Sequence, residues 1–114
     1  MNKYLIFRTD RIGDFLVSAI LIKCIKINDP SANITVIASD KNYYYIKLFP
    51  YVDRVELLNN NFLSKIILIF KLFKYRYKNI ILHDNKKRSK FISFFLRCNN
   101  KISIENTQKV LHIE

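Results

Sequence analysis

The chain has 114 residues, of which 50% are hydrophobic and 25% are charged, so one packed domain is expected and a disordered protein is excluded. Its net charge of +11 admits nucleic acid, anionic lipid or an acidic substrate as partners. The abundance of Lys, Asn, Ile and Tyr also fits an AT-rich genome, so part of this charge carries no functional signal. The first apolar run, Tyr4 to Phe7, is too short for a secretory signal, and no spacing of Cys24 or Cys98 indicates a metal site.

Short apolar runs and segments with helical spacing alternate along the chain. The expected elements are, in order, a strand at Lys3 to Arg8, a helix at Asp14 to Ile27, a strand at Ile34 to Ala38, a helix from a Ser39-Asp40 cap to about Leu48, a strand at Val52 to Leu57, a helix at Phe62 to Tyr77, a strand at Asn79 to His83, a helix at Arg88 to Arg97 and, after an Asn99-Asn100 turn, a strand at Lys101 to Ile104. Such alternation is typical of a parallel sheet with helices on both faces, so we predict an α/β, Rossmann-like fold. We assign residues 1–104 to this domain and residues 105–114, which show no period, to a tail.

The most apolar segment is Phe62 to Phe73. It is interrupted by Lys65 and Lys71, and it is shorter than the roughly 20 residues that a membrane-spanning helix needs. We predict a core helix for this segment. The alternative is an interfacial helix that lies on a membrane surface.

The loop after the first strand, Thr9 to Gly13, is the first candidate for function. In an open parallel sheet, ligands bind beyond the carboxyl ends of the strands, where the strand order reverses. The loop contains the only glycine of the chain, which lets the backbone turn sharply or a ligand approach closely. No Gly-rich dinucleotide or P-loop motif is present, so neither kind of phosphate cradle is expected. The loop instead offers the carboxylate of Asp14 at a helix start, flanked by Arg8 and Arg11.

This loop also carries a family resemblance. The segment Arg8-Thr9-Asp10-Arg11-Ile12-Gly13-Asp14-Phe15-Leu16-Val17-Ser18 is similar to the opening of family 9 glycosyltransferases, which add heptose to the lipopolysaccharide core. Three further stretches agree in order and spacing, namely Pro30 to Val36, Pro50 to Val55, and Ile81 to Asp84 with Arg88-Ser89. The resemblance extends to about residue 104, and the first motif is its most specific part.

The resemblance implies the amino-terminal, acceptor-side half of a metal-independent, inverting transferase of the GT-B type. No cofactor is implied, and the nucleotide-sugar donor, ADP-heptose in the family, would bind a second domain that this chain lacks. Asp14 would be the general base that takes the proton from the acceptor hydroxyl. A helix start and Arg11 both favour the ionised carboxylate and lower its basicity, so Asp14 would act by its position. The alternative is that Asp14 only caps the helix.

Basic residues follow the fourth strand. In the common doubly wound order this strand lies beside the first, so its outgoing loop would face the same site as Asp14. Cations at a helix start oppose the helix dipole, which favours binding of acidic groups over an exposed lysine-rich helix start. His83 and Asp84 are not expected to form a catalytic pair, because no nucleophile is placed to complete it. The predicted acceptor-binding residues are Thr9, Asp10, Arg11, Gly13, Lys86, Arg88 and Ser89.

The expected partner is an anionic, lipid-linked saccharide acceptor. We expect a cytoplasmic location with a peripheral contact to the inner face of the membrane, and no sugar transfer by this chain alone. A non-catalytic module that binds anionic glycolipid is the first alternative. The second is a small basic nucleic-acid binder, which is disfavoured because the chain lacks a docking motif and its aromatic residues lie mainly in apolar runs.

Overall fold

The computed structural model describes residues 2–9, 12–59, 61–84 and 86–103, while the side chains of residues 12–14 and 103 stay outside the description. The tail expected at residues 105–114 is also outside it. The strands are β1 (Lys3–Arg8), β2 (Asn33–Ala38), β3 (Arg54–Leu57), β4 (Arg76–Leu82) and β5 (Arg97–Ser103). The helices are α1 (Ile12–Asn28), α2 (Tyr43–Leu48), α3 (Phe62–Phe73) and α4 (Lys87–Phe94).

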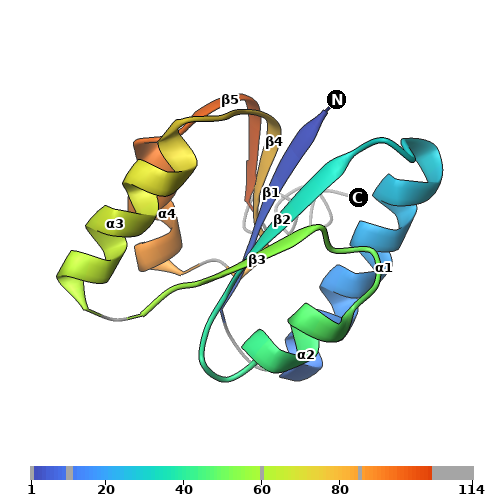
Figure 1. Cartoon of the computed structure of the whole chain (residues 1–114), viewed down its shortest axis with the longest axis horizontal. Coiled ribbons are helices and arrows are strands. Elements are labelled where there is room, and N and C mark those ends of the chain that lie inside the picture. Colours follow the sequence, from blue (N-terminus) through green and yellow to red (C-terminus); the bar gives the residue numbers. More distant parts are fainter. Residues whose placement is uncertain (1, 10–11, 60, 85, 104–114) are drawn as a thin grey trace, which may run out of the picture.

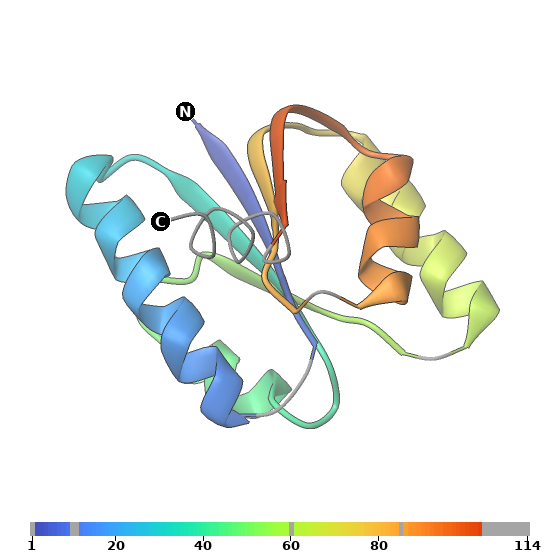
Figure 2. The same ribbon diagram turned by 180° about the vertical axis from the view of Figure 1, so that it is seen from behind.

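The strands form one parallel sheet in the order β3-β2-β1-β4-β5 within the described ranges. Helices α1 and α2 cover one face of this sheet, and α3 and α4 cover the other (Figures 1 and 2). The predicted Rossmann-like fold is therefore confirmed. The fourth strand pairs with the first, with Tyr4 opposite Asn79 and Phe7 opposite Leu82, as expected. The strand order therefore reverses between β1 and β4, which makes this the switch point of the sheet.

Two apolar clusters hold the helices onto the sheet. Residues of β1 alternate between them, because successive side chains of a strand point to opposite faces. Leu5 and Phe7 pack under α3 and α4, whereas Ile6 packs with Phe15 and Ile22 of α1. A continuous buried run in β1 and β2 is typical of parallel strands that are covered on both faces.

The prediction was wrong where α3 ends and β5 begins. Helix α3 ends at Phe73 instead of Tyr77, and β4 starts at Arg76. The expected turn at Asn99-Asn100 lies inside β5, where Asn100 pairs with Asn79. Asparagine favours turns, but here the parallel ladder with β4 overrides this preference because it satisfies the backbone groups of the segment.

The cap of α2 was also predicted wrongly. The helix begins at Tyr43, and its N-cap is Asn42 instead of the Ser39-Asp40 pair. The Asn42 side chain makes no capping bond. It is fully buried, donates to the carbonyl of Arg8 at 2.8 Å, and accepts from the N–H of Ser39 at 3.0 Å. Its amide thus joins the carboxyl ends of β1 and β2.

Helix α3 matches the predicted core helix on one side only. Leu68 and Leu72 are its buried residues. Asn61 caps it, because its side chain accepts from the N–H of Leu63 at 2.9 Å. Several of its other apolar side chains are exposed. Among the described residues, no helix has both the length and the apolar character needed to span a membrane.

Candidate functional site

Asp84 connects the ends of β1 and β4 with the start of α4. Asp84 is buried, with 7% of the residue exposed, and its carboxylate accepts from Thr9 twice, from the N–H at 3.2 Å and from the hydroxyl at 2.5 Å. The hydroxyl of Ser89 donates to the same oxygen at 2.7 Å, and the N–H of Lys86 donates to the other at 3.2 Å. The backbone N–H of Asp84 donates to the carbonyl of Phe7 at 3.1 Å. One side chain therefore fixes the loop after β1 against the loop after β4.

Two arginines strengthen this connection, because each donates to a backbone carbonyl of the other loop. The Arg8 guanidinium donates to the carbonyl of His83. The Arg88 guanidinium donates to the carbonyl of Thr9 at 2.9 Å. Arg8 is buried and Arg88 is half-buried, so both positive charges lie at the carboxyl edge of the sheet, next to the switch point. An anionic ligand is favoured at such a place, since guanidinium groups form strong charge-assisted bonds with phosphates and carboxylates.

His83 links the same edge to α1. Its ring Nδ1 lies 2.6 Å from the hydroxyl of Ser18, and the donor depends on the tautomer. Burial lowers the pKa of His83 from its ordinary value, the Arg8 charge lowers it further, and Asp84 opposes both. The imidazole is therefore mainly neutral at neutral pH. Ser18 lies in α1, so the residue that directly follows β4 contacts this helix.

Of the residues predicted around the first loop, the structure describes the backbone of Gly13 and Asp14 but not Asp10 and Arg11. Gly13 and Asp14 lie in the first turn of α1, which begins two residues earlier than predicted, at Ile12. Asp14 is thus the third residue of the helix, where the helix dipole favours an ionised carboxylate. Asp10 and Arg11 lie outside the described residues.

The residues predicted near the fourth strand do meet the first loop. Thr9 and Ser89 are both buried and share Asp84, while Arg88 reaches the Thr9 carbonyl. Lys86 is exposed at the start of α4. Asp84 was not predicted as the organising residue, although a carboxylate directly after a buried strand, with Ser and Arg shortly behind it, is a usable signal.

Metal ligands are not gathered at this edge. In residues 2–9, 12–59, 61–84 and 86–103, no group of three or more His, Cys, Asp or Glu side chains could hold a metal ion.

Comparison with known proteins gives a clear result at the level of the fold. No protein-family model matches the chain, and no curated protein matches it. The glycosyl transferase family 9 from Veillonella parvula DSM 2008 superposes with a TM-score of 0.76 at 12% identity, covering 90% of this chain and 32% of that one. The E. coli ADP-heptose lps heptosyltransferase II superposes with a TM-score of 0.73 at 19% identity, covering 90% of this chain and 30% of that one. The E. coli heptosyltransferase WaaC with ADP superposes with a TM-score of 0.75 at 15% identity, covering 88% of this chain and 34% of that one.

These neighbours define the class of fold. The chain has the fold of part of a family 9 glycosyltransferase of the GT-B type, as the Arg8 to Ser18 motif predicts. It spans about a third of the length of these structures. Their low identity to the chain restricts the likeness to the fold.

Proposed function

We propose that this chain is the acceptor-side part of a heptosyltransferase-like glycosyltransferase. Its carboxyl edge would bind an anionic saccharide, and Asp14 would act as general base. The hydrogen-bond network around Asp84 carries this proposal, because it holds Arg88 and the α4 start beside the loop of β1. This junction lies at the switch point, where ligands of open parallel sheets bind. Two structural neighbours are E. coli heptosyltransferases, one of them described as acting on lps with ADP-heptose.

The chemistry assigned to this edge is inverting sugar transfer. An acceptor hydroxyl attacks the anomeric carbon of the donor sugar, and its proton passes to the carboxylate of Asp14. The bond between that carbon and the nucleotide diphosphate breaks, and the diphosphate leaves with the electron pair. Asp14 acts mainly by position, since a carboxylate in the first turn of a helix is a weak base. The donor, ADP-heptose in this proposal, would bind in the part of the neighbours that this chain does not cover.

The remaining predicted residues receive two kinds of role. Lys86 and Arg88 supply positive charge toward phosphate or carboxylate groups of the acceptor. Thr9 and Ser89 hold the two loops together through Asp84, so their role is to position the residues that bind the acceptor. Asp10, Arg11 and Gly13 would bind the acceptor beside Asp14. An acceptor of this kind is lipid-linked, so the chain would work at the cytoplasmic face of the membrane, in peripheral contact with it.

Binding of a phosphorylated lipopolysaccharide-core saccharide, followed by calorimetry, tests the acceptor site. We expect Lys86→Ala to weaken binding about tenfold, the loss of one charge-assisted contact. Asp14→Asn should leave binding within about twofold, because the base is not the source of affinity. Lys78→Ala is the matched control, since Lys78 is exposed near the amino end of β4 and away from this edge.

Several outcomes would count against the proposal. Absence of saccharide binding would overturn it, as would equal losses with Lys86→Ala and Lys78→Ala. Tight binding of single-stranded DNA with a steep salt dependence would favour the nucleic-acid alternative instead. Saccharide binding without any transfer in the presence of ADP-heptose and a supplied donor-binding domain would favour the non-catalytic module. We also expect no transfer from ADP-heptose by this chain alone, so turnover by it would contradict the assignment of donor binding to a separate part.

A further inference from the structure

Helix α3 exposes a large apolar surface. It buries Leu68 and Leu72 against the sheet and half-buries Ile69, but most of its other apolar side chains are exposed. Leu63, Ile67 and Phe70 follow one another at helical spacing, so they form a stripe along one side of the helix. The exposed large side chains of α3 are Phe62, Leu63, Ile67, Phe70 and Phe73, each between 48% and 70% exposed.

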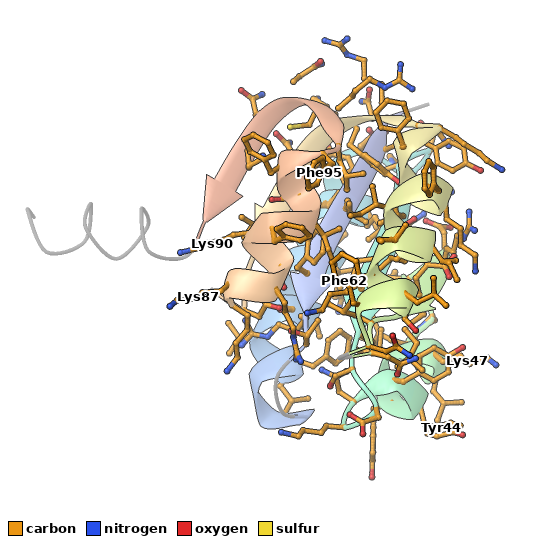
Figure 3. All side chains as sticks on the ribbon, turned by 90° about the vertical axis from the view of Figure 1, so that its left-hand side faces the viewer. Tyr44, Lys47, Phe62, Lys87, Lys90 and Phe95 are labelled. Carbon is orange, nitrogen blue, oxygen red and sulfur yellow. The ribbon has the colours of Figure 1, made fainter. Side chains whose placement is uncertain are left out.

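Helix α4 extends this surface. It lies beside α3 on the same face of the sheet in all three views (Figures 1, 2 and 3). Phe91, Phe94 and its C-cap Phe95 are also exposed, and the ring of Phe95 contacts each of the other two edge to face. Figure 3 shows Phe62 and Phe95 on the side that faces the viewer. We call these eight residues of α3 and α4 the α3–α4 apolar face.

The charges on and around this face are almost all positive. Neither α3 nor α4 contains Asp or Glu. Lysines lie within α3 at positions 65 and 71, just after it at 74, and on α4 at 87 and 90, the last two at the edge of the view in Figure 3. The nearby Glu56 is engaged by Arg54 at 2.7 Å and by Lys71 at 3.9 Å.

Arg97 adds a cation at the far end of the face. Its guanidinium lies 4.9 Å from the ring centre of Phe73 and donates to the Phe73 carbonyl at 2.8 Å. The combination is an apolar centre with cationic surroundings. Aromatic rings are stable at the boundary between headgroups and acyl chains, and lysines with long apolar stems reach the phosphate level from there. Anionic headgroups are therefore the partner that this charge pattern complements.

We propose that the α3–α4 apolar face docks on an anionic lipid bilayer, with α3 and α4 lying in its plane. Helix α3 has 12 residues, too few to cross the bilayer and enough to lie on it. Both helices start from the carboxyl edge of the sheet, because they follow β3 and β4. Docking on this face therefore brings the Asp84 junction close to the lipid surface. This inference does not depend on the proposed function, since the lipid alone is the ligand.

Co-sedimentation of the full chain with vesicles tests the docking face. We expect binding to phosphatidylcholine vesicles that contain phosphatidylglycerol, weaker binding to pure phosphatidylcholine, and loss of binding as salt is raised. Phe70→Ser and Leu63→Ser should each weaken binding about tenfold, as the loss of one buried apolar side chain predicts. Ile27→Ser is the matched control, since Ile27 is 67% exposed on α1, on the opposite face of the sheet.

The variants concern exposed side chains, so their circular dichroism and thermal unfolding should match the parent chain. Failure to bind anionic vesicles would overturn the proposal, and so would equal losses with Phe70→Ser and Ile27→Ser. A concentration-dependent dimer that Phe70→Ser abolishes would also contradict it, because a second copy would then cover the face. The vesicles carry no saccharide, so a negative result with them leaves the acceptor site untouched.

Discussion

Asp84 is the residue on which the geometry of the candidate site depends. Its buried carboxylate accepts from the backbone and hydroxyl of Thr9, from Ser89 and from the backbone of Lys86. Removing it would leave the buried hydroxyls of Thr9 and Ser89 without their acceptor, and an unsatisfied buried group costs more than a lost bond between exposed groups.

We therefore expect Asp84→Ala to lower the free energy of unfolding by about 2–4 kcal/mol, and Asp84→Asn to lower it by less, because the amide oxygen still accepts. Urea unfolding measures both. The exposed Asp40 supplies the control, since Asp40→Ala should change stability by less than about 0.5 kcal/mol. If Asp84→Ala were as mild as Asp40→Ala, the network would not be what holds the two loops together.

His83 gives the molecule a pH dependence with a definite sign. Its folded pKa is lowered from 6.5, chiefly by burial, so near and below that pH the unfolded chain binds more protons than the folded one. Stability from His83 is therefore complete above about pH 6.5 and is lost as the pH falls through the folded pKa. We expect His83→Gln to remove this part of the urea-unfolding profile. A ring titration by NMR with a pKa at or above 6.5 would contradict burial as the dominant influence on this imidazole.

Only some features of the candidate site could be predicted from the sequence. The position of Arg88 and Ser89 beside the first loop could be predicted, because they follow a recognisable strand in a family-like pattern, while their contact with an acceptor stays a prediction. Asp84 carried a local signal, but its partner did not, since Thr9 is 75 residues away and meets Asp84 only when β4 pairs with β1. The same is true of His83, whose contact with Ser18 spans 65 residues.

At the scale of elements, α3 combines a buried side with an exposed apolar one. Leu72 is almost completely buried, so Leu72→Ala should cost about 2–5 kcal/mol of stability through the lost contacts and the cavity. Phe70→Ala, in the same turn of the helix, should change stability by less than about 0.5 kcal/mol, because Phe70 is 70% exposed. Thermal or urea unfolding distinguishes them, and equal effects would show that Phe70 is packed in solution.

Periodicity could predict where α3 starts but not which side of it is buried. The segment is apolar nearly all round, so no stripe separates a core side from a solvent side. The end of α3 was missed for a related reason. Tyr75 and Tyr77 continue the apolar pattern, yet Tyr77 belongs to β4, where burial raises its pKa to about 12.

At the scale of the whole molecule, the strand order was predictable from alternation and the common doubly wound topology. The pairing of β4 with β1 then places two outgoing loops together, which the positions of Arg88 and Thr9 confirm. The same topology puts α3 and α4 on one face, so the proposed lipid-docking surface and the proposed acceptor site lie next to each other. Such an arrangement suits an acceptor that is itself anchored in a membrane.

An NMR titration of the labelled chain with the phosphorylated core saccharide tests the acceptor site most directly. We predict saturable shifts of backbone amides at Gly13, Asp14 and Arg88, with little change in the amino-terminal halves of the strands. Lys86→Ala should weaken these shifts, and Lys78→Ala should not. Saturable shifts confined to the amino edge of the sheet, or no saturable shifts at all, would contradict the placement of the acceptor at the carboxyl edge.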